Sequence, residues 1–174
     1  MAKYQPGDNY LPIIEKLQLT DADKQLMHIQ WINEMNYADN KAVVCKRYHT
    51  FIRLIVFIAG VIIPILSNTK FEVRMGDKFT FSNLTLITIL GVVVAIGIGL
   101  NQILKYEDRW NLYRRNAELL KNEGENFIGL GGAYHEAADH QHAFRDFNTN
   151  IASIKRQDVS NYFEKVLSKE KTKA

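Results

Sequence analysis

The stretch FTFSNLTLITILGVVVAIGIGLNQIL, residues 79–104, decides the fold class because none of its 26 side chains is ionisable. Its central part, Leu84–Leu100, is almost wholly apolar. About 20 apolar residues are enough for a helix to cross a bilayer, and uncharged runs of about 18 or more are typical of membrane spans. A chain of 174 residues has little protein with which to bury so long an apolar helix. We therefore predict an integral membrane protein with a span over residues 81–104.

A second uncharged run, Leu54–Thr69, lies upstream and contains 16 residues. A helix that begins near residue 49 reaches the full thickness of a bilayer, at about 1.5 Å per residue, but it includes Arg53. An arginine near a helix end can bury its methylene groups and place its guanidinium among the lipid headgroups. The sequence thus predicts a first span over residues 49–68, joined to the second by an external loop over residues 69–80.

The basic residues that flank the two spans predict the orientation of this hairpin. The flanks carry more of them (Lys41, Lys46, Arg47, Lys105, Arg109, Arg114 and Arg115) than the loop does (Lys70, Arg74 and Lys78). Cytoplasmic segments of membrane proteins are enriched in Lys and Arg. We expect a multi-pass protein of the bacterial inner (plasma) membrane with both termini in the cytoplasm. The N-terminus lacks the apolar core of a cleavable signal peptide, so the first span would act as the insertion signal.

Helical patterns dominate the parts outside the membrane. After an N-terminal segment, 1–20, Thr20 is a good N-cap for an amphipathic cytoplasmic helix over 21–48. No Gly or Pro interrupts the chain from there to Gly60, so this helix is expected to continue into the first span. Its apolar stripe follows 4-3-4-3 spacing: Trp31, Met35, Ala38, Ala42 and Cys45. Cys45 is the only cysteine, which excludes an intrachain disulfide, and we interpret it as a packed, inert thiol.

The second span is expected to continue in the same way into cytoplasmic helices over 105–167. A heptad seam follows it, at Ile103, Tyr106, Trp110, Tyr113, Ala117, Leu120, Gly124 and Phe127. The glycines of Gly129–Gly132 would end this helix, and a last helix would start near Tyr134. That helix has a second seam (Phe144, Phe147, Ile151, Ile154, then Val159, Phe163 and Val166), and a disordered tail is expected over 168–174. With no β-rich run in view, the predicted fold class is an all-α membrane hairpin continuous with a cytoplasmic helical bundle.

The segment after the second span resembles a known family. The string WNLYRRNAELLKNE, residues 110–123, followed by a glycine cluster and Tyr134, is similar to the corresponding segment of bacterial SLATT proteins. It is most similar to the two-span family known as domain of unknown function 4231, where the segment reads roughly W-x-x-Y-R-x-x-A-E-x-L-K-x-E. The matching positions here are Trp110, Tyr113, Arg114, Ala117, Glu118, Leu120, Lys121 and Glu123. The order of a long amphipathic helix, a short hairpin of spans and a helical tail also agrees, over about residues 25–160.

The resemblance implies a pore-forming or membrane-perturbing effector in a bacterial stress or defence system. Some SLATT proteins are linked to antiphage systems that signal through nucleotides.

One face of the second span is small and polar. At about 100° per residue, this face contains Thr85, Thr88, Gly91, Ala95, Gly99 and Gln102. Gly91, Ala95 and Gly99 form a repeated small-xxx-small motif, which lets membrane helices approach closely. Two interpretations stay open: the face packs against another helix, or its polar ends line a narrow pore.

The first span groups Arg53, Phe57, Gly60, Pro64 and Ser67 on one side of its helical wheel. Pro64 is able to kink the helix. Arg53 stands alone among neutral residues, and both a pore-mouth charge and an arginine that reaches the lipid phosphates are consistent with that position. Because two spans cannot enclose a conduit, a channel would have to be a homo-oligomer.

The first turns after the second span suggest a cytoplasmic collar. Trp110, about 9 Å beyond Leu104 along a helix, would lie just past the membrane surface. Arg114 and Glu118 stand at i and i+4 and are expected to form an ion pair. We interpret these three residues as a collar that couples motion of the cytoplasmic helices to the spans.

The histidine-rich segment His135–His142 offers a weak metal candidate. Its two outer histidines and an acid, His135, Asp139 and His142, would share one helix face at i, i+4 and i+7. A zinc-protease helix is excluded because the second histidine of the H-E-x-x-H motif would have to be residue 139. We predict no metal site, no cofactor and no enzyme activity, since no phosphate-binding loop, nucleophile triad or cysteine cluster is visible.

Two functions therefore remain for this chain. The first is a homo-oligomeric pore or ion channel, for which the bilayer and further copies of the chain are the expected partners, together with an unidentified regulatory partner. The alternative is a membrane-anchored helical scaffold or sensor that does not conduct. No nucleic-acid binding is expected.

Overall fold

The computed structural model describes residues 5–69, 72–75 and 79–171, and it is helical apart from one short β-hairpin. The chain divides into two compact units. The first contains residues 1–43 and 109–174, and the second contains residues 44–108. The long helices α3 (Asn33–Ser67) and α5 (Tyr106–Ile128) contribute to both.

The first unit is a helical bundle with an aromatic core. It begins with the 3₁₀ turn η1 (Pro6–Tyr10) and the short helix α1 (Leu11–Ile14), followed by α2 (Asp21–Met27). A π-helical turn (His28–Ile32) joins α2 to α3 without a loop, so the predicted continuous helix is present with one widened turn. As predicted, Thr20 caps α2, since its side chain accepts a hydrogen bond from the Asp23 N–H at 3.2 Å.

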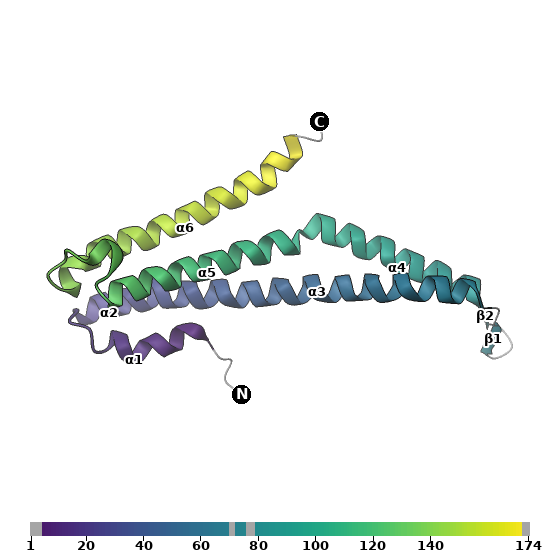
Figure 1. Ribbon diagram of the computed structural model, residues 1–174, viewed down its shortest axis with the longest axis horizontal. Helices are drawn as coiled ribbons and strands as arrows, with labels where there is room; N and C mark the ends of the chain where they lie inside the picture. Colours follow the sequence, from purple (N-terminus) through teal and green to yellow (C-terminus); the bar gives the residue numbers. More distant parts are fainter. Residues whose placement is uncertain (1–4, 70–71, 76–78, 172–174) are drawn as a thin grey trace. The chain divides into compact units, whose positions relative to one another are not determined.

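The core of this unit lies where α3, α5 and α6 (His140–Lys171) meet, and the helices run alongside one another there in Figure 1. Trp31, Phe127 and Phe147 have no exposed surface. The rings of Phe127 and Phe147 stack with centroids 4.4 Å apart, and Trp31 meets Phe147 edge-on at 6.1 Å. The predicted seams are therefore confirmed at Trp31, Met35, Ala38, Ala42 and Cys45, at Ala117, Leu120, Gly124 and Phe127, and at Phe144, Phe147 and Ile151, all of which are buried.

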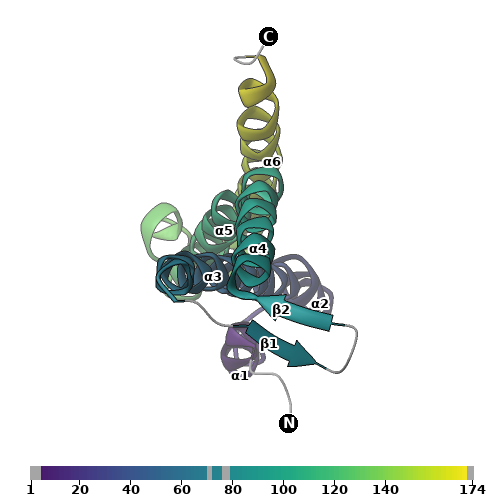
Figure 2. The ribbon, with the colours of Figure 1, turned by 90° about the vertical axis from the view of Figure 1, so that its right-hand side faces the viewer.

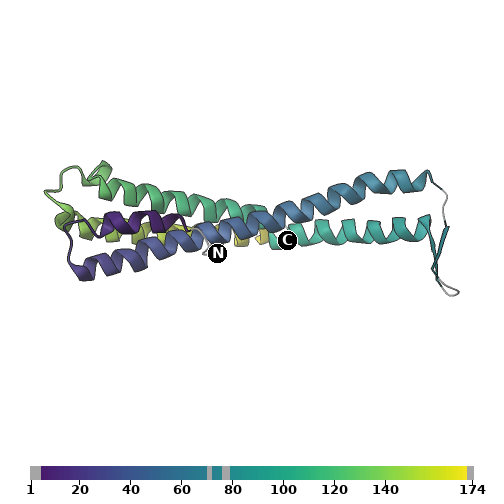
Figure 3. The ribbon, with the colours of Figure 1, turned by 90° about the horizontal axis from the view of Figure 1, so that it is seen from below.

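The second unit is an antiparallel pair of apolar helices, the C-terminal part of α3 and α4 (Asn83–Leu104), which lie side by side in Figures 1 and 3. Both are long and apolar enough to cross a membrane. No residue of α4 is buried. The predicted hairpin of two apolar helices is thus confirmed, and its outer surface is the kind that lipid covers.

A β-hairpin lies between these helices, where a loop was predicted. Strands β1 (Glu72–Met75) and β2 (Phe79–Ser82) pair antiparallel, with Glu72 opposite Ser82 and Met75 opposite Phe79 (Figure 2). The prediction of an all-α fold missed them because it placed residues 79–80 in the external loop and residues 81–82 in the second span. Their aromatic and threonine side chains, FTFS, favour a strand.

The long helix expected after the second span is also interrupted. Lys105 adopts a left-handed conformation (φ 46°) and its N–H bonds to the Asn101 carbonyl at 3.1 Å, which ends α4 before α5 begins at Tyr106. Ile103, predicted to open the seam of α5, is consequently 76% exposed. The glycine cluster ends α5 as predicted, with Leu130 and Gly132 both at positive φ.

The last helix differs from its prediction at both ends. It begins at His140, not near Tyr134, because Asp139 caps it by accepting the N–H of His142 at 2.9 Å. It extends to Lys171, into the segment 168–174 for which a disordered tail was expected, since Lys and Glu are good helix formers. Residues 172–174 lie outside the described residues, and no side-chain placement is described for Val159, Phe163 and Val166 of the predicted second seam.

Candidate functional site

The face of α3 that packs in the apolar hairpin continues the stripe found in the sequence. Beyond Cys45, the positions at least partly buried follow the same 4-3 spacing: His49, Ile52, Val56, Ala59, Ile63 and Leu66. Ala59 is buried although it lies in the middle of an apolar helix with little protein around it. One seam of period 3.5 therefore extends along the whole helix, the spacing at which helices pack with side chains interlocked.

The partner face of α4 contains Gly97. A Cβ at this glycine would lie 2.7 Å from Cγ2 of Val56, so the two helices touch there. At one end of the hairpin the Asn83 amide donates to the Thr69 carbonyl at 2.7 Å, and at the other Asn101 contacts His49. The glycine that lets the hairpin close is thus Gly97, which the small-xxx-small motif did not include.

The predicted small and polar face of α4 lies away from α3. Thr85, Thr88, Gly91, Ala95 and Gln102 are exposed, and a Cβ at Gly91 or Gly99 would meet nothing within 4 Å. Both threonine hydroxyls have hydrogen-bond partners close to them in sequence. The Thr85 hydroxyl lies 3.1 Å from the Ser82 hydroxyl, and the Thr88 hydroxyl donates to the Leu84 carbonyl at 2.9 Å. This face is therefore not used by the hairpin, and it remains free to contact another molecule.

The residues grouped on the first span are also exposed. Arg53, Phe57, Gly60, Pro64 and Ser67 each stand one position after a seam residue of α3 and lie outside the hairpin contact. A Cβ at Gly60 would meet nothing within 4 Å. Pro64 lies three residues before the end of α3, which continues through it to Ser67.

The contact that the sequence did not predict is centred on His49. Only 7% of its surface is exposed. Its Nδ1 lies 3.3 Å from Oδ1 of Asn101, and its Nε2 lies 4.0 Å from Oε2 of Glu107 in the first turn of α5. Beside it, the rings of Tyr48 and Tyr106 stack with centroids 5.6 Å apart. The signal was present in the sequence, because His49 follows Cys45 by four residues and so occupies the next position of the stripe.

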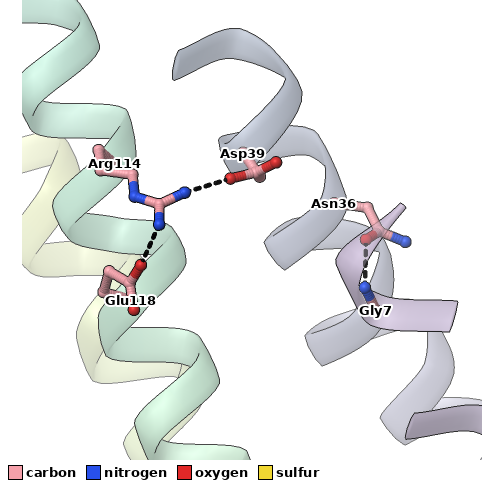
Figure 4. Close-up of polar contacts among 5 residues, drawn as sticks. All are labelled: Gly7, Asn36, Asp39, Arg114 and Glu118. Carbon is pink, nitrogen blue, oxygen red and sulfur yellow. Dashed lines mark hydrogen bonds and ion pairs between the residues drawn. The ribbon is translucent and has the colours of Figure 1, made fainter. Parts of the chain in front are cut away.

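The structure brings part of the predicted collar together in the first unit (Figure 4). Arg114 pairs with Glu118 at 2.5 Å, as predicted, and with Asp39 of α3 at 2.7 Å. Trp110 is half-buried one turn earlier on α5. The Asp39 contact was not predicted, and it makes Arg114 a bridge between two helices of the bundle.

A surface groove of about 310 Å³ lies beside this bridge. Its walls come from the N-terminal segment, α3 and α5, and its charged residues are Asp39, Arg114, Glu118 and Lys121. The N-terminal segment is held in place by the Gly7 N–H, which donates to Oδ1 of Asn36 at 2.8 Å (Figure 4). Because the opposite charges pair with one another, the groove offers no concentrated charge of one sign to a ligand.

The histidine-rich segment does not form the predicted helix face. His135 precedes α6 and its Nδ1 lies 2.9 Å from the Gly132 carbonyl, while Asp139 is occupied as the cap of α6. Hydrogen bonds from the backbone and ring of His142 hold the pKa of the Asp139 carboxyl below its ordinary value. Among the described residues no group of three or more His, Cys, Asp or Glu side chains is placed to hold a metal ion.

Comparison with known proteins places the chain in a family. No curated protein and no solved structure matches it. One family model, described as a protein of unknown function (DUF4231), matches residues 33–142, which include the second unit and all of α3 and α5. The chain therefore belongs to the DUF4231 family.

Proposed function

We propose that this protein is a homo-oligomeric membrane pore or ion channel of the SLATT type. Its physiological role would be that of a membrane-perturbing effector in a bacterial stress or defence system, as the resemblance to SLATT proteins implies. The proposal assigns no catalysis and no cofactor to the chain. The observation that carries it is the division of α4 into two faces.

The hairpin uses one face of α4 internally, at Gly97, and leaves the small and polar face exposed. In a bilayer no hydrophobic force drives helices together, so helices associate through close packing of small residues and through polar contacts. Gly91, Ala95 and Gly99 supply the first, and Thr85, Thr88 and Gln102 supply polar groups near both ends. Several hairpins arranged around this face would enclose a conduit, which one hairpin cannot do.

The orientation belongs to the same proposal. Both termini lie in the cytoplasm, with residues 69–80 outside, as the excess of basic residues in the flanks favours. In this arrangement Arg53, near the cytoplasmic end of the first span, is available to a pore mouth.

The alternative is a membrane-anchored scaffold or sensor that does not conduct. The first unit favours it, because its aromatic core and its bridges between helices are better developed than the polar features of the spans. Besides the Arg114 contacts, Lys155 of α6 pairs with Glu34 of α3 at 2.7 Å. Such a bundle could bind a partner while the spans served only as an anchor.

A single-channel recording of the purified full chain in a planar bilayer distinguishes the two functions. The pore predicts discrete conductance steps from a preparation in which more than one copy is counted in mild detergent. The Arg53→Gln variant should shift the reversal potential in a salt gradient, because removing a fixed positive charge at a pore mouth weakens its preference for anions. Lys16→Gln, which removes an exposed charge in the N-terminal segment, is the control. An oligomer without conductance would favour the scaffold.

A further inference from the structure

The hairpin contains an ionisable side chain that the proposed pore does not use. His49 is buried in an otherwise largely apolar seam, where a polar group without a partner is costly. It has two polar neighbours, one at each ring nitrogen. Asn101 lies at Nδ1 and Glu107 at Nε2.

The two contacts favour one tautomer of the neutral ring. The atom of Asn101 that faces Nδ1 is its carbonyl oxygen, 3.3 Å away, and this oxygen can only accept a hydrogen bond. This contact favours the tautomer that has its hydrogen on Nδ1, which leaves a lone pair on Nε2 of the neutral ring. Nε2 lies 4.0 Å from the carboxylate of Glu107, which also can only accept a hydrogen bond. The two groups therefore form no hydrogen bond until a proton is added to Nε2.

From this geometry we infer that His49 is a proton-binding site whose charged form is bound by Glu107. A proton added at Nε2 becomes a donor to Glu107, and a charged N–H···O bond of this kind is about 2.7–2.9 Å long. The Glu107 side chain can move from 4.0 Å to this shorter distance because it is 63% exposed. Protonation would thus join α3 to the first turn of α5.

The position of Glu107 places this bond next to the break between α4 and α5. Glu107 follows Lys105, the left-handed residue at which α4 ends, so it belongs to the first turn of the next helix. The stacked rings of Tyr48 and Tyr106 already hold the same two elements together, which keeps Glu107 in reach of the imidazole. Proton uptake would therefore strengthen the attachment of α3 across the interruption at Lys105.

Other charged groups stand close to the site in the sequence of both helices. On α3, Lys46 and Arg53 stand one turn before and after His49, and both are exposed. On the opposite side, Lys105 and Asp108 flank Tyr106 and Glu107. Because protonation at Nε2 creates the donor, the bond to Glu107 should form when the ring is charged and be absent when the ring is neutral.

The test measures the bond itself, and it does not depend on conduction. The full chain, labelled with ¹⁵N-histidine and ¹³C-glutamate, is reconstituted in lipid bilayers and studied by solid-state NMR at pH 5 and pH 8.5. The His49 ring signals are assigned by their loss in the His49→Gln variant. We expect an imidazolium with a dipolar contact from Nε2 to the Glu107 carboxylate at pH 5, and a neutral ring without that contact at pH 8.5.

Two variants complete the test. Glu107→Gln should show a smaller fraction of His49 imidazolium at pH 6 than the wild type, because it removes the charge that favours the protonated ring. Glu136→Gln, which changes an exposed acid before α6, should leave that fraction unchanged. The inference is overturned if His49 stays neutral at pH 5, if its imidazolium has no contact with Glu107, or if the two variants have the same effect. A pore that conducts with any of these results would leave the proposed function standing.

Discussion

The indole ring of Trp31 lies against the backbone of Gly124, so close that a Cβ at residue 124 would fall 1.8 Å from Cζ2 of the ring. The ring is fixed there by a hydrogen bond from its Nε1 to the Leu120 carbonyl at 2.7 Å, one turn earlier on α5. The rings of Tyr10 and Phe147 contact it from other sides, at centroid distances of 5.1 and 6.1 Å. This contact joins α5 to the start of the long helix and leaves the indole no room to move.

Replacing Gly124 by Ala should therefore destabilise the bundle strongly. Overpacking a tight core costs typically about 1–3 kcal/mol, and a rigid ring in direct contact places this site at the upper end. The free energy of unfolding of the full chain in detergent, followed by tryptophan fluorescence during denaturant titration, measures the loss. Gly60→Ala is the matched control, because a Cβ there meets nothing within 4 Å. Equal stability of the two variants would contradict the contact.

The buried hydroxyl of Tyr134 predicts a loss of stability at alkaline pH. Burial, and secondly its hydrogen bond to Glu123, raise the pKa of the Tyr134 hydroxyl well above its ordinary value. The folded state therefore favours the neutral phenol. This contribution is fully present below about pH 10, the ordinary tyrosine value, and is lost as the pH rises toward the raised pKa of the folded state.

Tyr134→Phe should reduce this alkaline dependence. At neutral pH it should cost about 1 kcal/mol, the typical net value of one hydrogen bond, although Asn150 still donates to Glu123 at 2.8 Å. Unfolding titrations between pH 7 and 11 measure both effects. Tyr37→Phe removes an exposed hydroxyl and should leave the pH dependence unchanged. If the free energy of unfolding of Tyr134→Phe fell with pH as steeply as that of the wild type, this hydroxyl would not control the alkaline loss of stability.

The ion pair between Arg114 and Glu118 should contribute little to stability. The Arg114 side chain is 52% exposed and Glu118 is 44% exposed, so water screens their attraction. Glu118→Ala is expected to lower the free energy of unfolding by no more than about 0.5 kcal/mol, as for other exposed pairs one turn apart. A change in oligomer size or gating with so small a loss would assign the pair to assembly, as the collar hypothesis requires. A loss above about 2 kcal/mol would show instead that the pair is structural.

The elements that follow from hydrophobic periodicity were predictable from the sequence, and those that depend on one backbone conformation were not. The stripe from Trp31 to Cys45 repeats often enough for its period to be read without a structure. The break at Lys105 has no such signal in the sequence. Lysine rarely adopts positive φ, and residues 102–108 around it contain no Gly or Asn. The helix start at His140 was missed because the Asp139 cap was assigned to a helix interior.

The candidate site was predicted only as a set of faces. A helical wheel separates the polar face of α4 from the rest, but it does not say which face meets α3. Gly91, Gly97 and Gly99 are equally small in the sequence, and only the packing of Val56 distinguishes Gly97. His49 was missed because the predicted stripe was followed only as far as Cys45, although His49 is its next position.

The proposed orientation can be tested with single cysteines. In a Cys45→Ala background, we expect Asn68→Cys, at an exposed position after α3, to react with an impermeant thiol reagent on intact cells. Gln157→Cys, at an exposed position of α6, should react only after the cells are opened. The opposite pattern would invert the hairpin and place the bundle outside.

The three glycines of α4 allow a direct test of the proposed oligomer. Gly91→Leu and Gly99→Leu should weaken self-association, because they fill the small face that lies away from α3 and hold neighbouring hairpins apart. A loss of about 1–2 kcal/mol is a reasonable scale for contacts between membrane helices.

Gly97→Leu should act differently: its side chain meets Val56, so it should open the hairpin within one chain. Mass measurement in mild detergent reports the oligomer, and a distance between spin labels at residues 58 and 93 reports the hairpin. We expect smaller oligomers with an unchanged spin-label distance for the first two variants, and an increased distance for the third. If Gly91→Leu and Gly99→Leu both kept the wild-type mass, the small face would not be the interface, and the argument for a pore built on it would fail.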